Sequence, residues 1–182
     1  MRLYVVRHGV AETEARRGGD SARRLTAAGR AKVRKIARGL RVLRVTVAAL
    51  LTSPLPRAAE TATILAEHGR LPLPVELPAL ATGTAPLGTL RALAPHAKRG
   101  DLMIVGHEPG LSRLVALLLT GSPDGLAIDL RKGGVVALEL DHLAPHRATL
   151  LWLGTPRLLR RLGRGKRGKR QEASGRTGRT SP

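Results

Sequence analysis

The sequence predicts a three-layer α/β/α sandwich on a mostly parallel sheet with one antiparallel terminal strand, followed by a disordered basic C-terminal tail. Short apolar runs typical of buried strands alternate with segments whose apolar residues recur at helical spacing, which favours a largely parallel sheet covered on both faces. The last two apolar runs, residues 135–140 and 148–153, are joined by a short polar segment and indicate an antiparallel pair. From about Arg157 the apolar spacing ends.

In the first half of the chain, four elements follow from the spacing of apolar residues. Leu3 to Val6 form an unbroken apolar run, which is typical of a buried strand. Thr26 is a suitable N-cap for a helix over residues 27–40, whose apolar positions recur every three or four residues. A second apolar strand spans residues 46–52. The next helix covers residues 53–69 and ends at a glycine, the residue that most often follows or closes a helix.

The second half of the chain continues the alternation. Residues 73–77 lie between two prolines and predict a short edge strand, because proline cannot donate to a central ladder. A helix over residues 86–96 has a proline in its first turn, where the missing N–H is tolerated. Residues 102–105 form a buried apolar strand, and residues 111–119 form a helix that stops before a glycine. The two final strands complete the sheet.

Length and composition indicate one domain, residues 1–156, and a separate tail, residues 157–182. The 182 residues suffice for one domain with a core and are too few for two ordinary ones. The absence of cysteine excludes disulfides, thiolate metal sites and cysteine nucleophiles, and agrees with a reducing cytosol. The N-terminal apolar run ends at Arg7 and is too short for a signal peptide, and no apolar segment approaches a membrane span. We therefore expect a cytoplasmic protein.

The formal net charge of +19 is compatible with a basic tail that binds a partner and with a site that attracts an anionic substrate. Residues 157–182 contain ten basic residues against Glu172 alone, and this tail either stays solvated without a specific role or contacts nucleic acid, an acidic partner or an anionic membrane surface. Nucleic-acid modules usually combine basic patches with aromatic stacking platforms, but Tyr4 and Trp152 are the only aromatics and both fall in predicted strands. A positive field also attracts anionic, phosphorylated substrates.

Polar side chains follow three of the predicted strands at the point where each strand ends. Arg7 and His8 follow the first strand, Arg57 lies in the helix after the second, and His107 follows the strand over residues 102–105. Because the carboxyl ends of parallel strands meet at one edge of a sheet, we expect these four side chains to converge on one pocket. Helix N-termini at the same edge add positive dipole ends.

A pocket with two guanidinium and two imidazole groups favours a dianion. Arginine presents a fork of donors that matches two phosphoryl oxygens and stays charged at any relevant pH. We expect no metal and no cofactor, because a cation would face fixed guanidinium charges without a carboxylate cage. Phosphoryl transfer to a nitrogen nucleophile is the chemistry that this set supports, since a neutral imidazole can attack while the other donates a hydrogen bond.

At these residues the chain resembles the histidine phosphatase superfamily, which has the phosphoglycerate mutase-like fold. The similarity extends over about residues 1–155 and is strongest to the short phosphohistidine phosphatases of the SixA type. Four segments carry it in the family's order: Arg7-His8-Gly9, Asp20 to Gly29 with Arg24 in place of a proline, Ser53-Pro54-Leu55-Pro56-Arg57-Ala58-Ala59-Glu60-Thr61, and Val105 to Pro109 followed by Lys132-Gly133-Gly134.

This resemblance implies roles for the four site residues. His8 would be the nucleophile that forms a covalent phosphohistidine, and Arg7, Arg57 and His107 would bind the phosphoryl oxygens and stabilise the transition state. The same resemblance implies a metal-independent phosphatase.

The chain lacks an acid at the position where related enzymes protonate an alcohol leaving group. Ala79 stands where related short enzymes often have Glu, and Glu12, Glu76 and Glu108 do not have the motif position. Imidazole, with a conjugate-acid pKa of about 6.5, leaves a phosphoramidate with far less help than an alkoxide. We therefore expect a phosphohistidine-bearing protein as substrate. The alternatives are a small-molecule phosphomonoesterase and a non-catalytic protein that binds phosphate or nucleic acid through its basic tail.

Overall fold

The computed structural model describes residues 1–13 and 19–164, and these form an α/β sandwich around one six-stranded sheet. The strand order across the sheet is β3-β2-β4-β1-β5-β6. The first four strands in this order run parallel, whereas β5 is antiparallel to both β1 and β6. The strand bounds are β1 Arg2–Arg7, β2 Ala49–Thr52, β3 Pro74–Glu76, β4 Leu102–Gly106, β5 Val135–Leu140 and β6 Ala148–Gly154.

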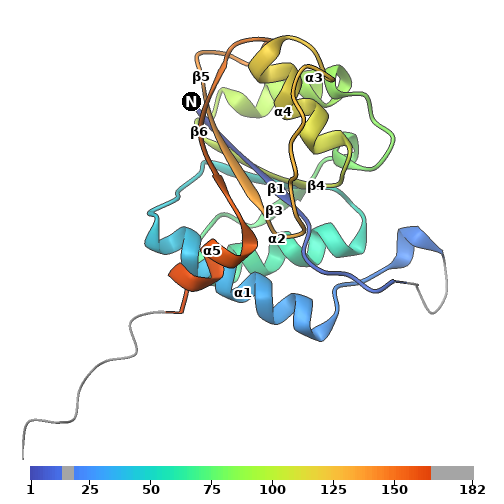
Figure 1. Ribbon diagram of the computed structural model, residues 1–182, viewed down its shortest axis with the longest axis vertical. Coiled ribbons are helices and arrows are strands. Elements are labelled where there is room, and N and C mark those ends of the chain that lie inside the picture. Colours follow the sequence, from blue (N-terminus) through green and yellow to red (C-terminus); the bar gives the residue numbers. More distant parts are fainter. Residues whose placement is uncertain (14–18, 165–182) are drawn as a thin grey trace, which may run out of the picture.

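Helices cover both faces of the sheet (Figure 1). Helices α1, α2 and α5 pack together on one face, and α3 and α4 pack together on the other. Two short 3₁₀ turns, η1 and η2, lie in the connecting loops. The bounds are α1 Ala27–Val42, α2 Pro56–Gly69, α3 Pro86–Ala97, α4 Gly110–Thr120, α5 Pro156–Leu162, η1 Asp20–Ala22 and η2 Pro78–Leu80.

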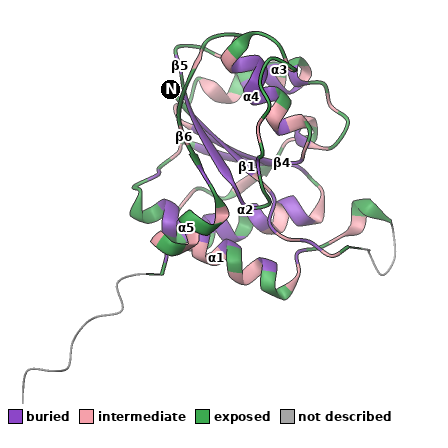
Figure 2. Ribbon diagram, in the orientation of Figure 1, coloured by how far each residue is buried: buried purple, intermediate pink, exposed green. Residues whose placement is uncertain are grey.

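The apolar side chains of the sheet separate into two cores, one on each face. Successive residues of a strand point to opposite faces. In β1, Tyr4 and Val6 accordingly lie in the core beneath α1 and α2, while Leu3 and Val5 lie in the core beneath α3 and α4. The inner strands are buried along their length, and β6 at the edge is largely exposed (Figure 2). This double burial explains why the inner strands are unbroken apolar runs.

The predicted fold class is confirmed, and the largest shifts are at the starts of β2 and α2. Strand β2 begins at Ala49, three residues later than the predicted strand. Helix α2 begins at Pro56 because the Ser53 hydroxyl accepts a hydrogen bond from the Leu55 N–H at 3.2 Å and holds the residues before the helix in a turn. In α1, the Thr26 hydroxyl accepts from the Gly29 N–H at 2.9 Å, as expected of an N-cap.

Helix α5 begins where the basic tail was expected to start, and it packs closely on α1. Leu159 is fully buried between the two helices. A Cβ on Gly39 would lie 2.1 Å from the Leu159 carbonyl oxygen, so only glycine permits this approach. The described fold thus extends to Arg164, and the rest of the predicted tail, residues 165–182, lies outside the described residues. Nowhere in the described ranges is a helix long and apolar enough to cross a membrane.

Candidate active site

The carboxyl ends of β1, β4 and β2 meet at one edge of the sheet. Because Arg7 of β1 pairs with Gly106 of β4, the residues that follow these two strands are neighbours. The His8 N–H donates to the Gly106 carbonyl at 3.1 Å, and the Ser53 N–H donates to the Val105 carbonyl at 2.9 Å. The sheet ladder therefore continues past the strand ends and fixes the backbone from which the site side chains project.

The two imidazoles, of His8 and His107, lie side by side in this edge. Their ring centroids are 5.0 Å apart, the ring planes are inclined by 49°, and each residue is 4% exposed. Nδ1 of His8 lies 2.7 Å from the Gly9 carbonyl oxygen. Since a carbonyl can only accept, Nδ1 carries the proton, and the Nε2 of a neutral His8 keeps its lone pair.

The ring of His107 is held from the neighbouring strand. Its Nε2 lies 2.8 Å from the Ser53 hydroxyl oxygen. Its Nδ1 is buried and has no hydrogen-bond partner among the described residues. A buried polar nitrogen without a partner is costly, so this atom is a natural contact for a ligand oxygen.

Arg57 projects from the first turn of α2 and is 2% exposed. Its guanidinium group contacts Asp20 of η1 twice: Nη1 donates to the backbone carbonyl at 2.7 Å, and Nη2 donates to the carboxylate Oδ2 at 3.0 Å. The other carboxylate oxygen of Asp20 lies 3.1 Å from Nε of Arg23. Asp20 is the site residue that sequence reasoning missed as a contributor, because a loop residue joins the site only through the folded position of the loop.

Arg7 approaches the site from the β5 side. Its Nη1 donates to the Leu130 carbonyl at 2.9 Å. The Gly133 N–H donates to the carbonyls of Arg7 and His8, at 3.0 and 3.1 Å. This glycine has a φ of 81°, in the left-handed region that favours glycine. The segment before β5 thus joins the end of β1, and all four predicted residues, Arg7, His8, Arg57 and His107, lie at one edge of the sheet.

The environment favours the neutral form of both imidazoles. Burial, the largest cause, and the positive charges of Arg57, Arg7 and Lys132 together lower the pKa of His8 to about 4, although the hydrogen bond to the Gly9 carbonyl opposes this shift. Burial and the nearby His8 and Arg57 lower the pKa of His107 to about 3, although the Asp20 carboxylate opposes this shift. Both rings are therefore uncharged near neutral pH, and Nε2 of His8 keeps its lone pair.

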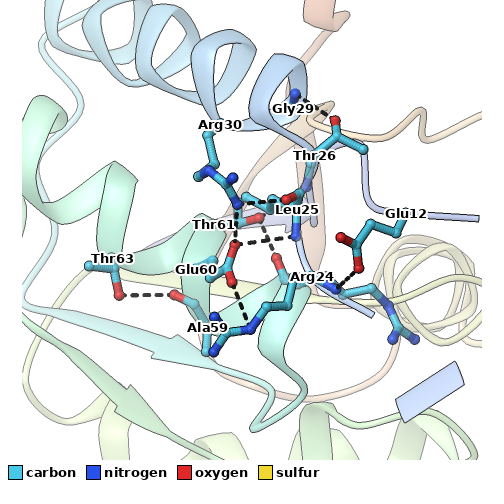
Figure 3. A network of polar contacts seen from close by, with 12 residues as sticks. Glu12, Arg24, Leu25, Thr26, Gly29, Arg30, Ala59, Glu60, Thr61 and Thr63 are labelled. Carbon is cyan, nitrogen blue, oxygen red and sulfur yellow. Dashed lines mark hydrogen bonds and ion pairs between the residues drawn. The ribbon is translucent and has the colours of Figure 1, made fainter. Parts of the chain in front are cut away.

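Glu60 of α2 fastens the loop that leads from β1 to α1 (Figure 3). Its Oε2 accepts from the Leu25 N–H at 3.2 Å and from Arg30 Nη1 at 3.3 Å, and its Oε1 lies 3.5 Å from Arg24 Nε. Arg24, which replaces the proline of the resembled segment, also donates its N–H to a Glu12 carboxylate oxygen at 3.3 Å. Proline could not make that hydrogen bond.

The three acids considered from the sequence, Glu12, Glu76 and Glu108, do not contact the four predicted site residues through any hydrogen bond among the described residues. Glu12 accepts from the Arg24 N–H, and Glu76 ends the exposed edge strand β3. Glu108 accepts from the Ser112 hydroxyl at 2.8 Å. Within residues 1–13 and 19–164, no three His, Asp or Glu side chains gather as a group that could hold a metal ion.

A cleft of about 730 Å³ opens beside His107. The loop before α3 and the start of α4 form its walls, largely from small and apolar residues such as Ala81, Gly83, Pro86 and Leu87. The cleft adjoins the imidazole pair, because His107 belongs to its lining.

Two neutral imidazoles and two guanidinium groups at the carboxyl edge of a parallel sheet define a phosphatase, a hydrolase of phosphoryl groups. The sequence comparison agrees, since residues 3–80 match the family model of the Histidine phosphatase superfamily (branch 1). The chain belongs to this superfamily.

Known proteins resemble the chain over most of its length. An uncharacterized protein of Picosynechococcus sp. (strain PCC 7002) is 35% identical over 148 residues, which cover 76% of this chain and 85% of that protein. The structure of the protein histidine phosphatase SixA complexed with tungstate has a TM-score of 0.75 and 26% identity, and the match covers 86% of this chain and 97% of SixA. A putative alpha-ribazole-5'-P phosphatase from Escherichia coli has a TM-score of 0.63 and 20% identity, with 86% and 97% covered, which shows the shared fold alone.

Proposed function

We propose that the protein is a metal-independent phosphatase that removes the phosphoryl group from phosphohistidine in a protein. The phosphoryl group passes to Nε2 of His8 and then to water. The observation that carries this proposal is the uncharged His8 ring, whose Nδ1 is held by the Gly9 carbonyl at 2.7 Å while Nε2 keeps its lone pair. The likeness to SixA, a protein histidine phosphatase, supports the choice of substrate.

In the first step, the Nε2 lone pair of His8 attacks phosphorus. A new N–P bond forms as the N–P bond of the substrate breaks. Water protonates the other ring nitrogen of the substrate as that bond breaks, so that the group leaves as neutral imidazole, and the hydroxide produced takes up a proton released in the second step. Arg7 and Arg57 stabilise the charge on the equatorial oxygens. The Ser53 hydroxyl accepts from the Leu55 N–H and donates to Nε2 of His107, so that Nδ1–H of His107 donates to a phosphoryl oxygen.

In the second step, water attacks phosphorus in the phosphorylated His8. Orthophosphate leaves, and the bonding electrons return to Nε2, which restores the free enzyme. The leaving group is an imidazole in both steps: that of the substrate in the first and that of His8 in the second. Imidazole is a far better leaving group than an alkoxide. Of the acids near the site, Asp20 is bound to Arg57, and Glu108, which lines the cleft beside His107, accepts a hydrogen bond from the Ser112 hydroxyl.

The test compares wild type and His8→Ala on a phosphohistidine-bearing protein. We expect the variant to lose turnover by several orders of magnitude and to lose the acid-labile, alkali-stable phosphoryl adduct that the wild type forms. A His142→Ala variant, altered in an exposed loop, is the matched control and keeps full activity. Full retention of turnover in the His8 variant would refute the proposal.

A small-molecule phosphomonoesterase is the second candidate, and the 730 Å³ cleft beside His107 favours it because the cleft has room for a small leaving group. Ratios of kcat/KM for phosphohistidine protein against sugar and nucleotide monoesters separate the two candidates. The third hypothesis, nucleic-acid binding by the tail, concerns residues 157–182, and of these residues 165–182 lie outside the described residues. That hypothesis and a cytoplasmic location stay predictions.

A further inference from the structure

The carboxylate of Asp20, in the loop before α1, accepts a hydrogen bond from Arg57. Arg57 is the residue whose N–H groups would bind a phosphoryl group. Arg57 is almost fully buried, and its charge is balanced by the Asp20 carboxylate, at 3.0 Å from Nη2. A buried guanidinium without an anion would be strongly destabilising. The contact therefore has a clear physical cause in the free protein, but it also occupies a donor that a phosphoryl oxygen would use.

Arg57 contacts Asp20 through two hydrogen bonds, of which the one to the side chain can be exchanged while the one to the backbone remains. Nη1 of Arg57 donates to the backbone carbonyl of Asp20 at 2.7 Å, whereas Nη2 donates to the side chain. Nε of Arg57 is buried and has no hydrogen-bond partner in the described ranges. Nε and Nη2 form one edge of the guanidinium group, and this edge matches two oxygens of a phosphoryl group. Departure of the carboxylate alone would therefore free a complete bidentate edge.

Two further observations allow the carboxylate to move. The Asp20 side chain is 66% exposed, whereas that of Arg57 is 3% exposed, so the acid and not the base is free to change position. The second carboxylate oxygen of Asp20 already lies 3.1 Å from Nε of Arg23, which gives the acid a partner after it leaves Arg57. If the carboxylate remained, it would face the phosphoryl dianion at close range, and like charges repel.

We propose that Asp20 holds the Arg57 guanidinium in the free enzyme and is exchanged for phosphoryl oxygens when substrate binds, so that Asp20 sets the affinity of the site for phosphate. This inference rests on the proposed function, because it assumes that Arg57 binds the phosphoryl group. Asp20 then acts as an internal competitor: it weakens the binding of substrate and, equally, of the product orthophosphate. The same carboxylate that limits affinity helps orthophosphate to leave.

The test measures the affinity of orthophosphate and of tungstate by calorimetry for wild type, Asp20→Asn and Asp20→Glu. We expect Asp20→Asn, which removes the charge and keeps the size, to bind both oxyanions about tenfold more tightly. Asp20→Glu keeps the charge and stays closer to the wild type. In turnover, KM and the inhibition constant of orthophosphate should fall together in Asp20→Asn without a rise in kcat.

Asp101→Asn is the matched control for net charge. Asp101 accepts from the Arg2 N–H at 2.7 Å at the start of β1, the opposite end of the sheet from the site, and its variant should bind oxyanions as the wild type does. Unchanged or weaker oxyanion binding by Asp20→Asn, relative to this control, overturns the exchange and leaves the proposed function standing. Absence of oxyanion binding in the wild type as well overturns the phosphate site itself.

Discussion

At the scale of single residues, the site depends on keeping two histidines uncharged in a strongly positive pocket. Burial is the largest cause of the lowered pKa of each ring, and the neighbouring arginines add to it. A protonated His8 would have no lone pair on Nε2 and would be repelled by Arg7 and Arg57. The positive charges of Arg7 and Arg57 therefore help to keep the His8 ring in its neutral form.

The pH dependence of turnover follows from these values. Because the pKa of His8 is lowered to about 4, its neutral form is complete above about pH 5 and is lost as the pH falls through 4. We expect kcat/KM to stay flat from about pH 5 to 8 and to fall about tenfold per unit below the pKa. Rates measured with His8→Ala, subtracted at each pH, correct for spontaneous hydrolysis of the phosphoramidate. A midpoint near the ordinary histidine pKa of 6.5 would contradict the structure.

The limits of sequence reasoning at this scale are shown by Asp20. Arg7, His8 and His107 could be predicted as neighbours because each follows a strand, and parallel strands end at one edge. Asp20 follows no strand and reaches Arg57 from a loop that is not periodic. Its contact depends on the path of the loop, for which the residue pattern carries no comparable rule.

At the scale of elements, one side chain of α2 holds the loop before α1 against the helix. Glu60 accepts from the Leu25 N–H and from Arg30, and it lies next to Arg24 (Figure 3). The same loop carries Asp20 to Arg57, also in α2. Helix α2 therefore supplies both Arg57 and the Glu60 carboxylate that holds the loop facing the helix.

Replacing Glu60 by Ala is expected to destabilise the protein by about 1–3 kcal/mol, because the part-buried Leu25 N–H loses its acceptor. Urea unfolding measures this loss, and the KM for a phosphorylated substrate should rise as the loop shifts. Glu67→Ala is the control on the same helix, since Glu67 is exposed and lies two turns further along. Equal effects of the two variants would show that the Glu60 contacts do not hold the loop.

The order and type of the elements could be predicted because the two cores impose clear patterns. Inner strands buried on both faces are unbroken apolar runs, and the helices show one apolar face each. The start of α2 could not be placed, because the turn over Ser53 and Leu55 rests on a hydrogen bond between them. The packing of α5 also escaped prediction: it depends on the absence of a side chain at Gly39, opposite Leu159.

At the scale of the whole molecule, the two buried imidazoles of the site make the free energy of unfolding depend on pH in the acidic range. Their pKa values of about 4 and 3 in the folded protein lie below the ordinary value of 6.5. Between these limits the unfolded chain binds more protons than the folded one, so the free energy of unfolding falls as the pH falls. The contribution of the two neutral histidines to the free energy of unfolding is complete above pH 6.5. It has been lost once the pH has fallen to their pKa values in the folded protein.

We expect His8 alone to account for a loss of about 3 kcal/mol between about pH 7 and pH 4. Urea unfolding of wild type and of His8→Ala at both values measures it, because the carboxylates titrate alike in the two proteins and cancel in the difference. His142→Ala serves as the control, since its ring is exposed. Parallel stability curves for wild type and His8→Ala would contradict the buried, neutral state of this ring.

The position of β4 between β1 and β2 has a consequence for how the enzyme becomes active during its synthesis. A nascent chain that ends before Leu102 already contains Arg7, His8 and Arg57, but β1 and β2 share no edge in the sheet until β4 pairs with both. The same strand delivers His107 at its end. Arg7 and His8, which follow β1, therefore stay apart from Arg57, which follows β2, until β4 pairs with both strands and brings His107.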